Sequence, residues 1–318
     1  MISLADIHAA QERIRPYVRR TTTVHSRTLS EVLGANIYLK LEIFQTTGAF
    51  KVRGAFNKIL VALDAARKNG VVAVSGGNHA QAVAYAGKLL GCRTVILMLH
   101  TTPRNYLDAT RGYGAEVVQF DEISQAFAKA RDYEQEGMLF VHPFDDPLVM
   151  AGQGTLGLEI LEDVPELTDI FVSIGGGGLM SGTAVAIRSQ KNVRFWGVET
   201  EGADAMARAL DAGHPVEIRP TSIAKTLGAP AVSATTLGIA KEHLANITVV
   251  SDKEAVQALA LLLERTKVLT EPAASCTLAA ALRMKKRFRP EHHIALILCG
   301  GNLGVNDLCE YHARFLKS

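Results

Sequence analysis

Lys51 is the residue whose surroundings first indicate chemistry. It lies in the stretch Thr47-Gly-Ala-Phe-Lys-Val-Arg-Gly-Ala55, between a strand-like apolar run at Asn36–Glu42 and a helix-like run at Ala55–Ala66. A buried Lys loses its charge readily because desolvation disfavours the ammonium form. A neutral Lys amine can form a Schiff base with an aldehyde. From this stretch alone, a solvated Lys at the start of a helix remains the alternative.

A second stretch of interest is Ser75-Gly-Gly-Asn-His79, which follows a strand-like run at Gly70–Ser75. Paired glycines let backbone N–H groups approach an anion, and the helix that follows adds the positive end of its dipole. The amide of Asn78 could donate to an oxygen on a ring. The alternative is a tight turn in which Asn78 or Ser75 caps the helix.

Two further glycine turns follow strand-like runs, Gly175-Gly-Gly-Gly-Leu179 and Cys299-Gly-Gly-Asn302. Four consecutive glycines are costly in chain entropy, and a phosphate cradle of backbone N–H groups would explain them. No Gly-Lys-Ser/Thr follows, so the loop is not a Walker loop. Binding of a nicotinamide dinucleotide by this loop is a less favoured interpretation, but it is not excluded, because an acidic residue, Glu199, ends the next strand. Cys299 could face a ring nitrogen or could be an inert buried thiol.

The elements that must position these residues alternate between strands and helices along nearly the whole chain. Continuous Val, Ile and Leu runs predict strands that are covered on both faces. The sequence therefore predicts an α/β protein with open, mostly parallel sheets, in which ligands bind at the carboxyl ends of the strands. A polar, Pro-containing corner at Phe144–Pro147 is the expected division of the chain. The aperiodic stretch Gly213–Thr236 is expected to be a functional loop near a site.

Composition excludes several other classes of protein. The chain has 318 residues, a formal net charge of +2, and 48 % hydrophobic against 21 % charged residues, so a large core is expected. The basic run Arg283–Arg289 is interpreted as a solvated helix end and not as a nucleic-acid patch. The sequence has no apolar segment of membrane length, and the stretch Met1–Arg20 is interpreted as a polar amphipathic helix and not as a signal peptide. Four cysteines without metal-like spacing are consistent with a reducing cytoplasm.

The chain resembles the serine/threonine dehydratase and serine racemase group, which are pyridoxal-phosphate enzymes of the tryptophan-synthase β-subunit fold (fold type II). The resemblance covers nearly the full length. It is carried by the motif around Lys51, by Ser75–Gln81, by the His142–Thr155 segment, by Gly175–Leu179, and, after these, by Glu271-Pro272 and Cys299–Asn302. It implies a large cofactor-binding domain at residues 1–65 and 146–318, and a small substrate-side domain at residues 66–145, with the active site in the cleft between them.

The resemblance also implies a role for each residue. Lys51 would bind the cofactor as a Schiff base and later move the α-proton, and Cys299 would lie at the pyridine nitrogen as a neutral thiol. Asn78 would donate to the ring hydroxyl. The remaining cofactor-binding residues would be Phe50 at the ring plane, Glu271 near the ring hydroxyl, and the phosphate-binding Gly175, Gly176, Gly177, Gly178 and Leu179. The substrate carboxylate would be bound by Ser75, Gly76, Asn78 and His79.

The activity implied is β-elimination from a β-hydroxy L-amino acid, with release of a 2-oxo acid and ammonia. Serine racemases carry a second Ser, on the face opposite the Lys, at the position of Gly76, so racemisation is a weaker alternative here. A catalytically silent ligand-binding protein on the same fold is opposed by the intact Lys51, Asn78 and glycine loop. A small amino acid is the expected partner, with neither nucleic acid nor membrane, and the resemblance implies a homodimer.

Two departures from the group lead to further expectations. Lys225 stands where threonine and serine dehydratases commonly have an acid, which predicts a larger or acidic substrate such as 3-hydroxyaspartate or an intermediate of hydroxyectoine breakdown; the alternative is that Lys225 points to solvent. Many relatives bind a divalent cation through a Glu, a carbonyl and an Asp. Here Glu199 and Ala203 fit but Ala205 replaces the acid, so we expect no metal or a weakened site.

Overall fold

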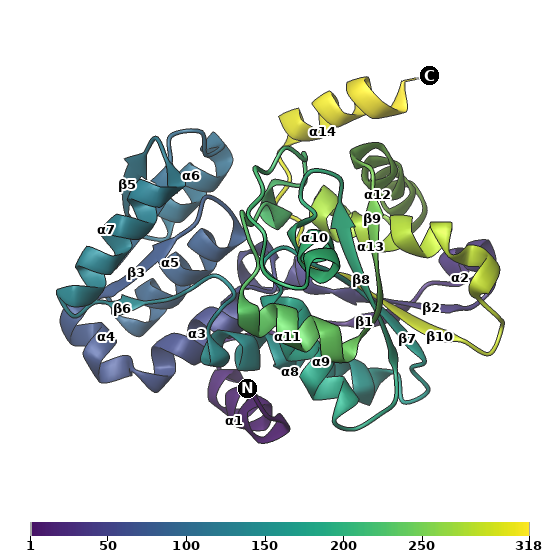
Figure 1. Cartoon of the computed structure of the whole chain (residues 1–318), viewed down its shortest axis with the longest axis horizontal. Helices are drawn as coiled ribbons and strands as arrows, with labels where there is room; N and C mark the ends of the chain where they lie inside the picture. Colours follow the sequence, from purple (N-terminus) through teal and green to yellow (C-terminus); the bar gives the residue numbers. More distant parts are fainter. Residues whose placement is uncertain (1, 318) are drawn as a thin grey trace.

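Two sheets form the framework of the computed structural model, which describes residues 2–317 (Figure 1). The larger sheet has the strand order β1-β2-β10-β7-β8-β9, and only the β1–β2 pair is antiparallel. The smaller sheet, with the order β5-β4-β3-β6, is parallel throughout. The strands are β1 Thr23–His25, β2 Asn36–Leu41, β3 Val71–Val74, β4 Thr94–Leu99, β5 Glu116–Phe120, β6 Leu139–Phe140, β7 Asp169–Ser173, β8 Arg194–Thr200, β9 Leu244–Val250 and β10 His293–Leu298.

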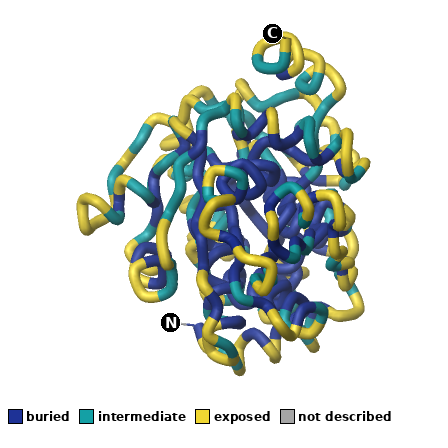
Figure 2. Tube along the Cα trace, turned by 90° about the vertical axis from the view of Figure 1, so that its right-hand side faces the viewer, coloured by how far each residue is buried: buried dark blue, intermediate teal, exposed yellow. Residues whose placement is uncertain are grey.

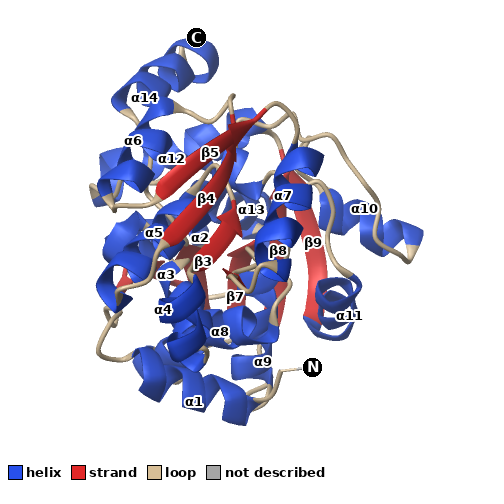
Figure 3. Cartoon of the chain, turned by 90° about the vertical axis from the view of Figure 1, so that its left-hand side faces the viewer, coloured by secondary structure: helices blue, strands red, loops and turns tan. Residues whose placement is uncertain are grey.

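Helices flank both sheets, with α4 to α7 around the smaller sheet and α8 to α13 around the larger one (Figures 1 and 3). Short helical turns lie at Glu42–Phe44 (η1), Thr46–Gly48 (η2), Lys225–Leu227 (η3), Lys285–Arg287 (η4) and His312–Leu316 (η5). The helices are α1 Leu4–Ile14, α2 Arg27–Leu33, α3 Val52–Val61, α4 Leu63–Asn69, α5 Asn78–Leu90, α6 Arg104–Gly112, α7 Ile123–Gln135, α8 Pro147–Asp163, α9 Gly178–Arg188, α10 Ala205–Ala212, α11 Ala234–His243, α12 Asp252–Thr266, α13 Pro272–Arg283 and α14 Val305–Tyr311.

The central strands are buried on both faces, which confirms the prediction from their continuous apolar runs. Every residue of β3 and of β7 is buried, and Figure 2 shows this buried interior surrounded by exposed helix faces and loops. Parallel sheets covered on both sides need such strands, because side chains of both orientations enter a core. The predicted α/β fold with mostly parallel sheets is therefore confirmed.

Several elements differ from the sequence-based expectation for local reasons. The helix expected at 55–66 begins at Val52 and is interrupted at Ala62, whose φ and ψ of −116° and 33° are not helical. Helix α8 begins at Pro147, because proline suits the first helical position and Asp146 caps the helix by accepting from Leu148 N and Val149 N. The expectation missed β1, α2, α10 and α11, which are short or begin in the stretch without periodicity.

The division of the chain into two units stays a prediction. All four strands of the smaller sheet lie between residues 71 and 140, inside the range expected for the small domain. However, Val52 and Phe56 of α3 pack in the same hydrophobic cluster as Val71 and Ala73 of β3. The helix that follows Lys51 therefore contacts the core of the smaller sheet, although the expected boundary assigns it to the large domain.

Candidate active site

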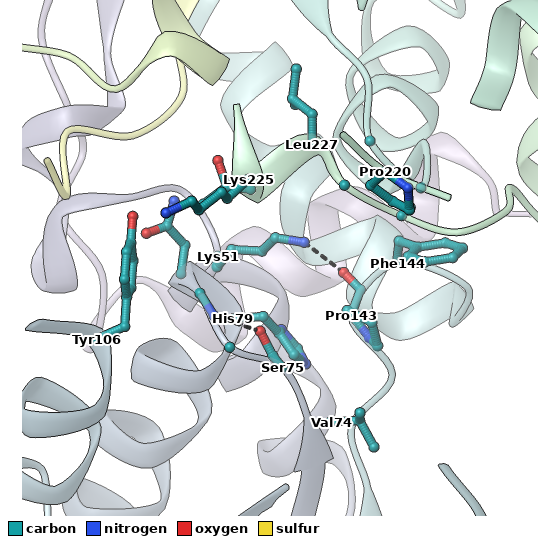
Figure 4. Close-up of a pocket in the computed structure, with 18 of the residues that line it drawn as sticks. Lys51, Val74, Ser75, His79, Tyr106, Pro143, Phe144, Pro220, Lys225 and Leu227 are labelled. Atoms are coloured by element: carbon teal, nitrogen blue, oxygen red, sulfur yellow. Dashed lines mark hydrogen bonds between the residues drawn. The ribbon is translucent and has the colours of Figure 1, made fainter. Parts of the chain in front are cut away.

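A cavity of about 500 Å³ lies where the carboxyl ends of strands from both sheets converge (Figure 4). Its walls come from segments far apart in the sequence, including the loops after β3, β4, β7 and β10. Polar groups gathered in a cavity of this size are typical of a small-molecule site. Every residue that the sequence singled out for the site lines it: Phe50, Lys51, Ser75, Gly76, Asn78, His79, Gly175, Gly176, Gly177, Gly178, Leu179, Lys225, Glu271 and Cys299.

Lys51 immediately precedes α3 and extends into the cavity (Figure 4). Its Nζ donates a hydrogen bond to the carbonyl oxygen of Pro143 at 2.7 Å and lies 5.1 Å from the centre of the Phe50 ring. Burial lowers the pKa of the Lys51 amine to about 8, although the Glu271 carboxylate acts in the opposite direction. The neutral form of the amine, which nucleophilic and proton-transfer chemistry requires, is therefore far more populated near neutral pH than in an ordinary lysine.

The backbone before Lys51 is fixed against the loop that follows β10. Thr47 and Gly48 both have a positive φ, of 68° and 71°, and a side chain at Gly48 would collide with Asn302. Phe50 N donates to Cys299 O at 3.1 Å. The strained turn and this backbone hydrogen bond therefore hold the segments that carry Lys51 and Cys299 next to each other.

The glycine loop between β7 and α9 has the properties of an anion cradle. Gly177 has a φ of 96°, and a Cβ there would lie 2.7 Å from Cβ of Thr236. A side chain at Gly176 would overlap the ring of Phe144, and one at Gly178 would lie 2.9 Å from the Phe144 backbone. Within residues 2–317, the N–H groups of Gly175 to Gly177 donate to no protein atom, and they lead into the N-terminus of α9. Such N–H groups fit a phosphate.

Cys299 presents a neutral thiol at the cavity wall. Burial raises its pKa to about 12, and the nearby Glu271 carboxylate acts in the same direction. Its Sγ lies 3.3 Å from Oγ of Ser173, the last residue of β7. A thiol in this state can donate a weak hydrogen bond to a ring nitrogen but cannot stabilise a positive charge on that nitrogen as a carboxylate would.

The carboxylate of Glu271 connects three segments of the cavity wall. Its Oε1 accepts hydrogen bonds from Asn78 Nδ2 at 2.8 Å and from Thr226 Oγ1 at 3.0 Å, and its Oε2 accepts from Tyr106 at 3.4 Å. Burial raises the pKa of Glu271, while these donors oppose that shift. Asn78 Oδ1 accepts from Asn302, so one Nδ2 hydrogen of Asn78 remains for a ligand.

His79 is a neutral, buried histidine. Its Nε2–H donates to the carbonyl oxygen of Val141 at 2.8 Å, and burial lowers its pKa to about 3. Ser75 Oγ accepts from Gly77 N at 3.1 Å and so shapes the turn before α5. The side chain of His79 therefore has a structural role. The turn before α5 places the free N–H groups at the start of that helix at the cavity.

The stretch Gly213–Thr236 lies at the cavity, as expected of a functional loop. The short turn η3 within it brings Lys225, Thr226 and Leu227 to the wall. Lys225 is exposed and forms no ion pair with any residue in the described range 2–317. Gly175 approaches Leu227 so closely that a Cβ there would lie 3.2 Å from its backbone. The loop therefore joins the predicted phosphate cradle to the substrate side of the cavity.

Sequence reasoning missed Ser173, Thr226, Tyr106 and Thr102, which also line the cavity. The position of Ser173 at the end of a buried strand was a usable signal, because ligands in parallel sheets bind at such ends. Thr226 and Tyr106 gave none, since only their tertiary contacts with Glu271 bring them to the site.

Glu199, the carboxylate expected at the cation site, is engaged by backbone N–H groups. Both oxygens of Glu199 accept backbone N–H groups, from Met206 at 2.8 Å and Ala207 at 2.9 Å. Burial raises the pKa of Glu199 to about 8, and these two N–H groups oppose the shift. Among residues 2–317 no three His, Cys, Asp or Glu side chains gather as metal ligands. That no metal binds stays a prediction. Across the same residues, no helix has the length and apolar character needed to cross a membrane.

Comparisons with known proteins agree with this geometry. The family model described as "Pyridoxal-phosphate dependent enzyme" matches residues 14–300. The chain is 42 % identical to an L-threonine ammonia-lyase of Geobacter sulfurreducens, over 97 % of this chain and 77 % of the relative. It is 37 % identical to a catabolic L-threonine dehydratase of Staphylococcus aureus, over 96 % and 90 %. Maize serine racemase superposes with a TM-score of 0.92 at 33 % identity, covering 99 % of this chain and 98 % of that one.

Proposed function

Since the chain belongs to the family of pyridoxal-phosphate dependent enzymes, in the serine/threonine dehydratase and serine racemase group, we propose that it is a β-eliminating ammonia-lyase. Its substrate is a β-hydroxy L-amino acid of the threonine or serine type, and its products are a 2-oxo acid and ammonia. The observation that carries the proposal is the buried amine of Lys51, with a lowered pKa, in a cavity that also holds a glycine cradle of free N–H groups.

The residues present fit pyridoxal phosphate. The cradle that Phe144 and Thr236 keep free of side chains would bind the phosphate, Asn78 would donate to the ring hydroxyl, and the thiol of Cys299 would face the ring nitrogen. When bound, the cofactor supplies the electron sink for the carbanion at the substrate Cα. A neutral thiol at the ring nitrogen weakens that sink, which suits elimination because the carbanion need not persist.

Two proton movements are needed. The neutral amine of Lys51 takes the proton from the substrate Cα, and the β-hydroxyl leaves as water with a proton that the phosphate of the bound cofactor would supply. The N–H groups at the start of α5, beside Gly76, hold the substrate carboxylate and so fix which bond at Cα is broken. Racemisation would also need a proton donor on the second face, and Gly76 offers no side chain for that purpose.

The function is tested by assaying the wild-type protein and Lys51→Ala. We expect the wild type to show an absorbance band at the blue edge of the visible and to release oxo acid and ammonia. Lys51→Ala should lose the band and lower kcat by at least about 10³-fold, because a positioned proton-transfer group is lost. Lys88→Ala, at an exposed position of α5, serves as the control. Inversion of the substrate without oxo acid would indicate a racemase. Ligand binding without turnover would indicate the silent alternative.

Lys225 supports a narrower proposal about the substrate. It is an exposed cation at the cavity wall without an ion-pair partner among the described residues, and the neighbouring Thr226 is hydrogen-bonded to Glu271. We propose that it favours an acidic or larger substrate, such as 3-hydroxyaspartate, over threonine. A panel of threonine, serine and threo-3-hydroxyaspartate tests this. The proposal fails if threonine has the highest kcat/KM and Lys225→Asp leaves the ranking unchanged.

A homodimer and a cytoplasmic location complete the proposal, and both rest on the resemblance to the group. Sedimentation of the purified protein at micromolar concentration would measure the first of these.

A further inference from the structure

Two loops of the smaller sheet lie side by side at the cavity. Strands β3 and β4 are paired in parallel, with Val74 opposite Leu97, so their carboxyl ends lie at the same edge. The loop after β3 carries Gly76, and the loop after β4 carries Thr102. Both residues line the cavity.

The backbone conformation at residue 76 does not require a glycine. Its φ lies outside the left-handed region, so the chain could accept a side chain there. The obstacle is a neighbour: a Cβ at Gly76 would lie 2.6 Å from Oγ1 of Thr102 and 3.4 Å from its Cγ2. Thr102 therefore occupies the space that a side chain at residue 76 would fill.

The hydroxyl of Thr102 is available to a ligand. Thr102 N donates to Leu99 O at 3.0 Å, which fixes the turn that carries the side chain. Its Oγ1 forms no hydrogen bond with any protein atom in residues 2–317, and the residue is only partly buried at the cavity wall. A hydroxyl has one donor hydrogen and two acceptor lone pairs, and all of them remain unused here.

We propose that Thr102 is a specificity-determining residue that contacts the substrate, donating its hydroxyl hydrogen to the carboxylate of the bound amino acid from the space beside Gly76. The inference rests on the proposed function for the identity of the ligand. The carboxylate has lone pairs for several donors, so Thr102 acts together with the N–H groups at the start of α5. Gly76 is then one half of a pair, in which the loop after β4 supplies the side chain that the loop after β3 lacks.

The hydroxyl is tested with Thr102→Val and Thr102→Ser in the holoenzyme. Thr102→Val keeps the shape and loses the donor, so kcat/KM should fall about tenfold, mainly through KM, because a hydrogen bond to a charged group is lost in ground and transition states alike. Thr102→Ser restores the donor and should keep kcat/KM within about threefold of the wild type. The absorbance of the bound cofactor should be the same in all three proteins.

The pairing is tested with Gly76→Ser, Thr102→Ala and the double variant. Gly76→Ser alone should lower both the thermal midpoint and kcat/KM, because its Cβ meets Thr102 Oγ1. Adding Thr102→Ala removes the collision and returns a hydroxyl to the same space, so the double variant should exceed Gly76→Ser in both measurements. The two substitutions should therefore be strongly non-additive, as expected for residues in contact.

Two results would overturn the inference: an unchanged KM in Thr102→Val, or strictly additive effects of the two substitutions. Failure of the proposed function is recognised separately, by the absence of oxo acid from every β-hydroxy amino acid with the wild type. In that case the dissociation constants of serine and threonine, read from the change in cofactor absorbance, replace KM. Equal dissociation constants for wild type and Thr102→Val would then refute the role of the hydroxyl.

Discussion

Lys51 combines burial with access to a ligand cavity, and its reactivity follows from that combination. The surrounding protein desolvates the ammonium group, and within residues 2–317 its hydrogen-bond acceptor is the carbonyl oxygen of Pro143. The Glu271 carboxylate favours the charged form but does not outweigh burial. An amine in this state is available for covalent chemistry at a pH where an ordinary lysine is almost fully protonated.

A pH dependence follows for the protein freed of its cofactor. The folded-state pKa of Lys51, about 8, lies below the ordinary value of 10.5, so the amine is protonated below pH 8 and neutral above it. The rate at which added pyridoxal phosphate recombines should therefore rise with pH around a midpoint near 8. Stopped-flow absorbance measures this rate, with a model lysine amine as the control. A midpoint above 10 would contradict the lowered pKa.

At the scale of elements, α13 holds the substrate-side loop through Glu271, its N-cap residue. The turn η3 is anchored to this carboxylate by Thr226 Oγ1, and Tyr106 of α6 approaches the same carboxylate from the other side. The loop, α6 and α13 therefore share one buried acceptor. Loss of a donor leaves the carboxylate less well satisfied and frees the loop that carries Lys225.

Thr226→Val should therefore loosen the loop without disturbing the fold. A hydrogen bond to a charged group contributes about 1.5–3 kcal/mol, so we expect a roughly tenfold or larger rise in KM. Protease cleavage within residues 213–236 should become faster. The matched control is Thr221→Val, an exposed threonine of the same loop. Equal KM values and equal cleavage rates for the two variants would show that the anchor is unimportant.

At the scale of the whole molecule, a buried ionic network supports the segment that carries Lys51. Arg53 donates to Glu42 after β2 and to Glu159 of α8, and Lys40 of β2 donates to the same Glu159 at 2.7 Å. The side chains of Arg53 and Glu42 are at most 1 % exposed. This network ties α3 to the larger sheet, while the apolar face of α3 packs against the smaller one.

Arg53→Gln should destabilise the protein strongly, because it leaves two buried carboxylates without their main partner. Breaking a buried ion pair from one side costs about 3–5 kcal/mol. The free energy of unfolding, measured in urea, should fall by that amount. Arg20→Gln removes two ion pairs, with Glu162 and Asp163, in which Arg20 is 52 % exposed, and it should cost no more than about 1 kcal/mol. Similar losses in both variants would contradict a structural role for the network.

The sequence by itself determined the fold class and the turns that carry Lys51, Asn78, Gly175–Gly178 and Cys299 to the cavity. Continuous apolar strands specify parallel sheets, parallel sheets place their following turns at one edge, and the three glycine turns and Lys51 have the chemistry for a single cofactor. Each of these signals is local, so it can be found without coordinates. The boundaries of α3 and α8 were less predictable, because single residues such as Ala62 and Pro147 decide them.

Tertiary structure alone decided how those residues act. At residue 76 the space for a side chain is occupied by Thr102. That residue lies 26 positions away in the sequence, and the pairing of β3 with β4 brings it near. The lowered pKa of Lys51 and the raised pKa of Cys299 come from burial, which depends on every element around the cavity. Solvation and steric contact are properties of space and not of sequence distance, and for that reason they became visible only in the folded chain.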